Sequence, residues 1–261
     1  MSSPILVTGG TGRLGRHVVP RLLGAGYAVR ALSRNPGEPA DGVTPMAGDL
    51  STGEGVAEAL AGVDVVLHLA GGPKGDGDKA RTLVEAAKES GAPHLVYISV
   101  VGAERVPVVS RFDRMAFGYF AGKRAAELVI EQSGLPYTTL RATQFHDLVL
   151  ATVQGMAKLP VVPVPTSRFQ PVETEEVAER MVELALGGPA GLVAEMGGPV
   201  TYSLRDLVRG YLVATHKHRL TVPVRLPGGA ARAVRGGAIV ARGDASGKRT
   251  WEEFLAARAA S

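Results

Sequence analysis

The stretch Val7-Thr8-Gly9-Gly10-Thr11-Gly12-Arg13-Leu14-Gly15 lies between a short apolar run and a helix-like pattern over residues 13–23. Its glycines at positions 9, 12 and 15 have the spacing G-x-x-G-x-x-G, in the place where a dinucleotide-binding loop joins a strand to a helix. The first glycine permits the tight turn, the second lets the backbone approach a pyrophosphate, and the third lets the helix pack closely on its strand. Free N–H groups and the helix dipole would receive the phosphate charge. This turn therefore predicts dinucleotide binding.

The hydrophobic pattern alternates between strand-like and helix-like segments for about 200 residues. Apolar strands are expected at residues 4–7, 27–33, 63–70, 95–101, 137–140 and 192–196, and helices around 13–23, 80–87, 121–129 and 173–186. Strands that are apolar throughout and separated by helices predict an α/β fold with a parallel sheet covered on both faces. Pro20 predicts a kink or local break in the first helix.

The alternation fails after residue 200. Ser203 with Asp206 resembles a capping box before a helix that reaches about Ala214. A final helix is expected near residues 250–254, and we expect Trp251 and Phe254, three residues apart, to anchor it in the core.

Composition excludes several classes of protein. The chain has 261 residues, of which 45% are hydrophobic and 21% charged, as in ordinary globular proteins. It has no cysteine, which excludes disulfides, thiolate nucleophiles and cysteine-based metal centres, and no metal site is expected. No apolar run approaches the roughly 20 residues that cross a bilayer, and no signal peptide is evident. We expect a cytoplasmic protein without membrane association.

The net charge of +4 is unevenly distributed. Residues 1–199 carry 18 basic and 21 acidic side chains, whereas residues 200–261 carry 11 basic and 4 acidic ones. Such a basic segment could contact nucleic acid or an acidic partner. Because its basic residues are spread out and lack interleaved aromatic residues, we favour a solvated lobe near an anionic cofactor, and we expect no nucleic-acid partner.

The glycine-rich segment resembles the short-chain dehydrogenase/reductase superfamily, specifically the NmrA-like and NAD(P)H-binding subgroup of its atypical branch. The resemblance continues through residues 27–34, 48–50, 69–71, 97–102 and 141–145 and covers about three quarters of the chain. It implies a Rossmann-type doubly wound sheet, with residues 1–261 as a single NAD(P)-binding domain and residues 200–261 mostly as a small lobe that covers the substrate. The cofactor-binding residues implied or expected are Gly9, Thr11, Gly12, Arg13, Leu14, Gly15, Ser33, Arg34, Asp49, Leu50, Leu69, Ala70, Gly71, Ser99, Lys123, Ala142, Thr143, Gln144 and Phe145.

The end of the second strand indicates which nicotinamide cofactor is bound. NAD-preferring sites usually place a carboxylate there to accept from the ribose 2′-hydroxyl. Here the end reads Leu32-Ser33-Arg34-Asn35, and an arginine can grip a 2′-phosphate with charge-assisted hydrogen bonds. Arg13 can approach the same phosphate. We therefore expect NADP(H) to be preferred over NAD(H).

The roles of two residues expected near the adenosine, Asp49 and His68, have alternative interpretations. By resemblance Asp49 hydrogen-bonds the adenine amine, with Leu50 packing on the ring. The other interpretation of Asp49 is an N-cap for the following helix. His68 is expected to be a core or strand-end residue and not a ligand.

Tyr119 and Lys123 form a Tyr-x-x-x-Lys motif, which puts both on one helix face. By resemblance, the tyrosine hydroxyl donates a proton to the developing alkoxide, while the lysine lowers the tyrosine pKa and hydrogen-bonds the nicotinamide ribose. Ser99 is the candidate third member, which would polarise the substrate carbonyl or serve only the ribose or strand end. Gln144 could contact the substrate, and His146 is either an acid–base group or a loop histidine.

These features favour an NADPH-dependent oxidoreductase of the short-chain dehydrogenase type, which reduces a carbonyl or quinone-like small molecule by hydride transfer. One alternative is a non-catalytic, NADP(H)-sensing regulatory protein that acts through a protein partner. Another is an epimerase or isomerase that retains its cofactor. A homodimer is left open.

Overall fold

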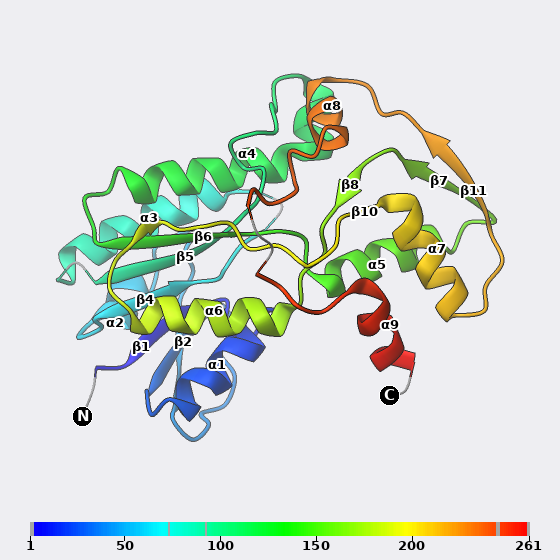
Figure 1. Cartoon of the computed structure of the whole chain (residues 1–261). Helices are drawn as coiled ribbons and strands as arrows, with labels where there is room; N and C mark the ends of the chain where they lie inside the picture. Colours follow the sequence, from blue (N-terminus) through cyan, green and yellow to red (C-terminus); the bar gives the residue numbers. More distant parts are fainter. Residues whose placement is uncertain (1–2, 73, 92, 244–245, 260–261) are drawn as a thin grey trace. The chain divides into compact units, whose positions relative to one another are not determined.

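The computed structural model describes residues 3–72, 74–91, 93–243 and 246–259 (Figure 1). The chain divides into two compact units. Unit 1 consists of Met1–Ser99, Gly122–Leu140 and Glu175–Ala194, and unit 2 of Val100–Ala121, Arg141–Thr174 and Glu195–Ser261. The expectation of a single domain whose residues 200–261 cover the substrate stays a prediction.

In the described residues, a seven-stranded sheet has the order β3-β2-β1-β4-β5-β6-β9. Its strands are β1 (Ile5–Thr8), β2 (Val29–Ser33), β3 (Val43–Ala47), β4 (Val65–His68), β5 (His94–Val100), β6 (Tyr137–Ala142) and β9 (Gly191–Leu192). β1 pairs in parallel with β2 on one side and with β4 on the other. The strand order therefore reverses at β1, where doubly wound sheets bind ligands beyond the carboxyl ends of their strands. The predicted α/β, Rossmann-type fold is confirmed.

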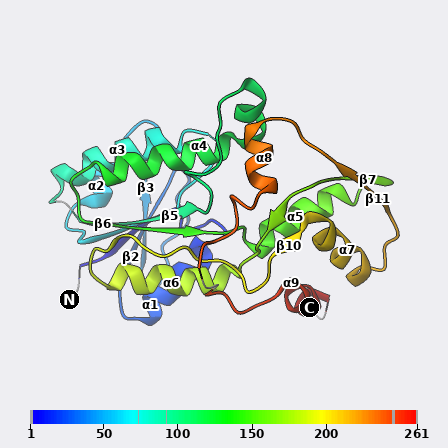
Figure 2. The ribbon, with the colours of Figure 1, turned by 45° about the horizontal axis from the view of Figure 1, so that its top comes forward.

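Helices cover both faces of this sheet, with α1 and α6 on one side and α2, α3 and α4 on the other (Figures 1 and 2). Their bounds are α1 (Gly15–Gly24), α2 (Val56–Leu60), α3 (Asp76–Glu89), α4 (Arg111–Glu131) and α6 (Thr174–Leu186). The predicted break at Pro20 is wrong, because α1 runs through it without interruption. Proline removes a single hydrogen bond here, and the burial of Val18 and Leu22 outweighs that loss.

Unit 2 contains two small sheets and four helices of its own, besides the first part of α4, in the described residues. β7 (Val161–Pro165) pairs in parallel with β11 (Leu220–Val224), and β8 (Arg168–Phe169) pairs antiparallel with β10 (Tyr202–Ser203). The helices are α5 (His146–Met156), α7 (Leu204–Ala214), α8 (Gly229–Arg235) and α9 (Trp251–Ala259). The capping box of Ser203 and Asp206 at the start of α7 is confirmed.

The main core of unit 2 packs α9 against α5, β7 and α7. Trp251 and Phe254 are buried in this core together with Val162, Leu207 and Tyr211. The predicted anchoring role of the two aromatic residues is therefore confirmed. No helix in the described part of the chain combines the length and apolarity that a bilayer crossing requires.

Candidate functional site

The glycine turn packs tightly against the neighbouring strand end. Gly9 has a positive φ of 73°, and a Cβ there would lie 2.7 Å from the backbone nitrogen of Ala70, just beyond β4. A Cβ on Gly15 would lie 2.3 Å from the carbonyl oxygen of Gly9. Only glycine fits either position, so the turn and residues 69–70 form one close-packed edge at the carboxyl ends of β1 and β4.

The helix that follows the turn is open to an anion. α1 has no acidic residue in its first turn and no side-chain cap, since Leu14 occupies the N-cap position. Thr11, Gly12 and Arg13 are exposed in the turn itself. Uncapped N–H groups with the positive end of the helix dipole are what a phosphate needs.

A buried polar cluster lies beneath this edge, on β1, β4 and β5. The Thr8 hydroxyl is 2.8 Å from His68 Nδ1, and the His68 ring stacks on Tyr97 with centroids 5.3 Å apart. Burial, with the nearby ammonium groups of Lys123 and Lys79, lowers the pKa of His68 to about 3. His68 is therefore a neutral structural residue, as expected from its place at the end of β4.

Lys123 reaches from α4 to the end of β4. Its ammonium lies 3.2 Å from the Asp76 carboxylate at the start of α3 and 5.1 Å from the centroid of the Tyr97 ring. Asp76 also accepts a 2.9 Å hydrogen bond from the Gly72 N–H. A Cβ on Gly71 would be 2.8 Å from Lys123 Nζ. The structure therefore brings the predicted residues Gly71 and Lys123 together. Gly71 directly follows Ala70, which contacts the glycine turn.

Asp76 is the residue of this cluster that the sequence interpretation missed. It is 2% exposed and supplies the negative charge beside Lys123. Burial lowers the pKa of Lys123, and the carboxylate of Asp76 opposes that shift. An acidic residue directly after the glycine-rich joint that follows the fourth strand was the available signal. It reads equally well as an ordinary first-turn acid on a helix.

The hydroxyl of Ser99, the residue expected to polarise a substrate carbonyl, is engaged in a hydrogen bond inside unit 1. Its hydroxyl donates a 2.5 Å hydrogen bond to Glu127 on α4, and the residue is buried. Glu127 is also paired with Arg124 at 3.0 Å. The Ser99 hydroxyl thus donates its proton to Glu127 and not toward a substrate carbonyl.

Residues expected to recognise the adenosine half lie at the ends of β2 and β3. Arg34 is exposed directly after β2, and the Ser33 hydroxyl exchanges hydrogen bonds with the backbone of Asn35. Asp49 accepts from the Ser51 N–H at 2.8 Å, and this bond is the main cause that lowers the Asp49 pKa. The alternative of Asp49 as an N-cap of the next helix is wrong, because α2 begins at Val56 with Gly55 at its N-cap. Leu50 is buried in the core of unit 1.

Tyr119 lies on the part of α4 that belongs to unit 2, whereas Lys123 belongs to unit 1. The two are four residues apart on one continuous helix, as the motif predicts. Tyr119 is 42% exposed and makes an edge contact with the ring of Phe120.

The segment after β6 is held by hydrogen bonds within unit 2. Gln144 donates to the Ile239 carbonyl at 3.0 Å and accepts from the Gln170 N–H at 3.1 Å. Thr143 donates to the Gln170 carbonyl, and Ala142 is buried. Phe145 is half-buried at the N-cap of α5. The amide of Gln144, expected to face a substrate, thus fastens this segment to residues 170 and 239.

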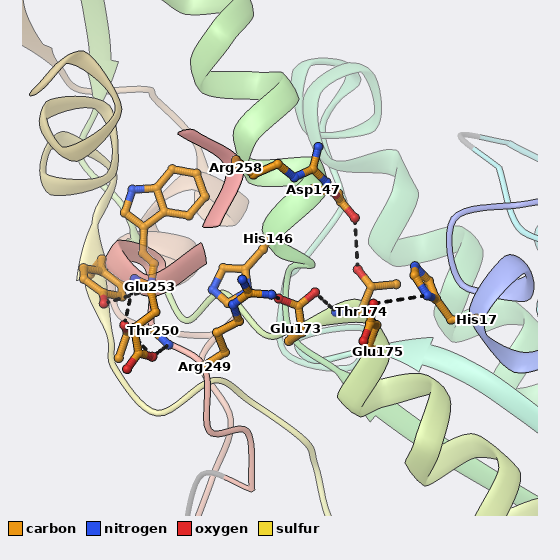
Figure 3. A network of polar contacts seen from close by, with 12 residues as sticks. His17, His146, Asp147, Glu173, Thr174, Glu175, Arg249, Thr250, Glu253 and Arg258 are labelled. Atoms are coloured by element: carbon orange, nitrogen blue, oxygen red, sulfur yellow. Dashed lines mark hydrogen bonds and ion pairs between the residues drawn. The ribbon is translucent and has the colours of Figure 1, made fainter. Parts of the chain in front are cut away.

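His146 is a buried residue on α5 and not a loop histidine (Figure 3). Its ring stacks on Phe254 with centroids 4.8 Å apart, and its Nδ1 lies 3.7 Å from Glu173 Oε2. Arg249 also pairs with Glu173, at 2.9 Å. Burial raises the pKa of Glu173, but His146 and Arg249 outweigh this effect and lower it to about 2. This arrangement fastens α9 to α5 and leaves the imidazole out of reach of a substrate.

The chain matches the model of a protein family described as NAD(P)H-binding over residues 9–186. It is 30% identical over 172 residues to the photosystem II assembly factor Ycf39 of Trieres chinensis, covering 61% of this chain and 49% of that protein. It is 32% identical over 216 residues to an isoflavone reductase homolog of Zea mays, covering 77% and 63%. The chain thus spans about half to two thirds of these relatives.

Among solved structures, the NADPH complex of the quinone oxidoreductase QOR2 from Escherichia coli is similar in fold. The TM-score is 0.76 at 21% identity, with 97% of this chain and 99% of that chain covered. The family match confirms the predicted NAD(P)H binding and the predicted superfamily, and some of the other relatives that the chain matches are named as reductases. The substrate and the individual roles of the site residues stay predictions.

Proposed function

Because this chain belongs to the NAD(P)H-binding family of atypical short-chain dehydrogenases/reductases, we propose that it is an NADPH-dependent oxidoreductase that reduces a carbonyl or quinone-like small molecule. One observation carries the proposal. A buried lysine, held by a buried carboxylate, lies at Gly71, and the adjacent Ala70 contacts the glycine turn. A dinucleotide whose pyrophosphate binds at Gly9–Gly15 would extend along this sheet edge.

Different parts of the site would bind different parts of the dinucleotide. The glycine turn and the start of α1 would hold the pyrophosphate, and Arg34 with Arg13 would grip a 2′-phosphate. Lys123 would hydrogen-bond the nicotinamide ribose. When bound, the cofactor supplies a hydride. Support for NADPH over NADH comes from the missing carboxylate after β2 and from the NADPH bound by the structurally similar quinone oxidoreductase.

Proton delivery is assigned to Tyr119. Reduction of a carbonyl adds a hydride to carbon and a proton to oxygen, and the phenol would donate that proton. The positive charge of Lys123 would stabilise the phenolate left behind, and solvent would restore the proton. Since the Ser99 hydroxyl is engaged by Glu127, this reaction would proceed without a serine at the carbonyl.

The experiment that tests the proposal combines binding and turnover. NADPH and NADH are titrated into the protein, and NADPH absorbance is then followed with a panel of quinones, aldehydes and ketones. We expect tighter binding of NADPH and its consumption with at least one substrate, at a rate that Tyr119→Phe lowers. Failure to bind either nucleotide, or consumption that Tyr119→Phe leaves unchanged, would overturn the proposal.

A second candidate is a non-catalytic NADP(H)-sensing protein with a protein partner. It is favoured by the engaged hydroxyl of Ser99 and by the similarity to a relative named as an assembly factor. It predicts tight binding with no turnover on any substrate and a cellular function that Tyr119→Phe does not affect. A cofactor-retaining isomerase would instead copurify with NADP and consume none. Cytoplasmic location and a homodimer stay predictions.

A further inference from the structure

Two stretches of unit 2 contain no acidic residue. Residues 148–172 and 207–243 have neither Asp nor Glu, while they carry two and seven Lys or Arg residues respectively. The whole chain has a net charge of only +4, so positive charge is concentrated in these stretches. Parallel pairing of β7 with β11 brings them side by side (Figures 1 and 2). Residues 148–172 therefore enlarge the basic surface that the C-terminal segment forms.

A hollow of about 790 Å³ lies where these two strands begin. Its lining includes four cations, Lys158, Arg209, Lys217 and Arg219, together with the imidazole of His218, and all five side chains are exposed. In the part of the chain that the structure describes, none of the five forms an ion pair with a carboxylate, whereas Arg105, Arg124 and Arg249 do. Arg219 is held by the Ala157 carbonyl at 3.2 Å and Lys217 by the Tyr211 hydroxyl at 3.3 Å. These contacts fix two cations at the hollow without neutralising them.

The outer face of the β7–β11 sheet is apolar. Val161 and Leu220 are register partners and are 46% and 65% exposed, and Val222 follows on the same face. On α7, Val213 is 69% exposed and lines the hollow. The opposite face of β7 is buried in the core through Val162 and Val164. Aliphatic side chains therefore project into solvent among unneutralised cations, which is costly unless something covers them.

We propose that this surface, the outward aliphatic side chains of β7, β11 and α7 with the four cationic side chains of the hollow, docks on a membrane that contains anionic phospholipids. We call it the basic face. Anionic headgroups complement the cations, and the aliphatic side chains enter the boundary between headgroups and acyl chains. This proposal differs from the expectation, drawn from the sequence, of a solvated lobe in a protein without membrane association. The proposal does not depend on the reductase reaction.

Other occupants fit the observations less well. Single-stranded nucleic acid binds basic surfaces whose aromatic side chains stack on bases, but Tyr211, the aromatic residue beside the hollow, is buried. Duplex binding would leave the projecting valines and leucine without a partner. A second copy of the chain that docked through the same face would bring cations against cations. A free phosphate would use the cations and leave the aliphatic side chains exposed.

The test measures sedimentation of the full chain with vesicles. Vesicles of phosphatidylcholine alone are compared with phosphatidylcholine mixed with phosphatidylglycerol, at increasing salt and with inorganic phosphate as competitor. We expect binding to the anionic vesicles only, weakening with salt. Removing two charges with Lys217→Gln and Arg219→Gln lowers the partition coefficient about 25-fold, at about fivefold per cation. Val213→Ser with Leu220→Ser lowers it several-fold at unchanged charge.

A matched control removes two exposed cations from α3 in unit 1 with Arg81→Gln and Lys88→Gln. This variant has the same net charge as the first double variant and retains vesicle binding, and melting temperatures establish that all variants fold. Equal binding to neutral vesicles, equal losses in the control, or no binding at all would overturn the proposal. So would tighter binding to duplex DNA than to vesicles, complete release by inorganic phosphate, or self-association through this face in sedimentation velocity.

Discussion

The ammonium of Lys123 and the carboxylate of Asp76 are 3.2 Å apart and both buried, at the end of β4 where the cofactor is expected to pass. Burial alone would favour a neutral lysine. Asp76 counteracts this effect and is itself fixed by the Gly72 N–H. The pair therefore keeps a charged ammonium in a place from which water is excluded.

Asp76→Asn removes the negative charge of this residue but keeps an oxygen that can accept the hydrogen bond from Gly72. The amide oxygen still accepts from Gly72, but Lys123 loses its counterion, so its pKa falls. We expect a loss of about 3 kcal/mol of folding free energy at pH 7, which shrinks at alkaline pH where Lys123 is neutral. Urea unfolding across pH, with NMR of lysine ε-carbons, measures both effects. Asp78→Asn, on the exposed side of the same turn, is the control, and equal effects of the two variants would contradict the assignment.

Gly71→Ala tests the space in front of Lys123. The new methyl group would meet the flexible end of the lysine at 2.8 Å and the Asp76 carboxylate at 3.3 Å, so the ammonium shifts while the backbone keeps its place. In Gly9→Ala the methyl group would meet backbone at 2.7 Å, with φ at 73°, and stability falls by several kcal/mol. We expect Gly71→Ala to weaken NADPH binding and to lower the melting temperature much less than Gly9→Ala does. Calorimetric titration and thermal unfolding check this, and unchanged affinity would count against a cofactor path at Gly71.

Arg34→Ala tests cofactor choice. If its guanidinium binds the 2′-phosphate, the variant loses charge-assisted hydrogen bonds, and NADPH affinity falls about tenfold or more while NADH affinity hardly changes. Fluorescence titration with both nucleotides measures the difference. Lys88→Ala, which removes an exposed cation from α3, serves as the control. Equal losses for NADPH and NADH would remove Arg34 from the site.

Tyr119→Phe tests proton delivery. The substitution removes one hydroxyl from a half-exposed side chain, so stability and NADPH affinity should stay near their original values. We expect kcat to fall by about 10²–10⁴-fold, the range found for general acids. Steady-state kinetics on the first substrate identified provides the measurement. A change in KM alone would assign the residue to binding.

Glu173 contributes a pH-dependent part of the stability of unit 2. Its pKa is about 2 in the folded protein against 4.5 ordinarily. A depressed carboxyl pKa stabilises the fold above the unfolded value, and this contribution is lost as pH falls from about 4.5 through about 2. Glu173→Gln should therefore cost about 2 kcal/mol at neutral pH and almost nothing near pH 2. Denaturant titrations of both proteins across pH measure it, with exposed Glu179→Gln as a control that shows no such dependence.

Local sequence patterns predicted much of the fold, because each depends on neighbouring residues. The glycine turn, the apolar strands and the cap of α7 all belong to this class. Partners distant in the chain were not predictable: Glu127 is 28 residues from Ser99, and Ile239 is 95 residues from Gln144. The sequence therefore predicted that the Ser99 hydroxyl and the Gln144 amide face a substrate. In the folded chain both groups form hydrogen bonds with residues distant in the sequence.

The burial of Trp251 has a consequence for biosynthesis. Its indole closes a core in which β7 and α5 leave the ribosome about a hundred residues earlier and α7 about forty residues earlier. Until α9 emerges, the apolar side of those elements is only partly covered, and nascent unit 2 would be a client for chaperones. A nonsense mutation that removed α9 would thus act mainly through aggregation or proteolysis, even though α9 supplies none of the proposed site residues.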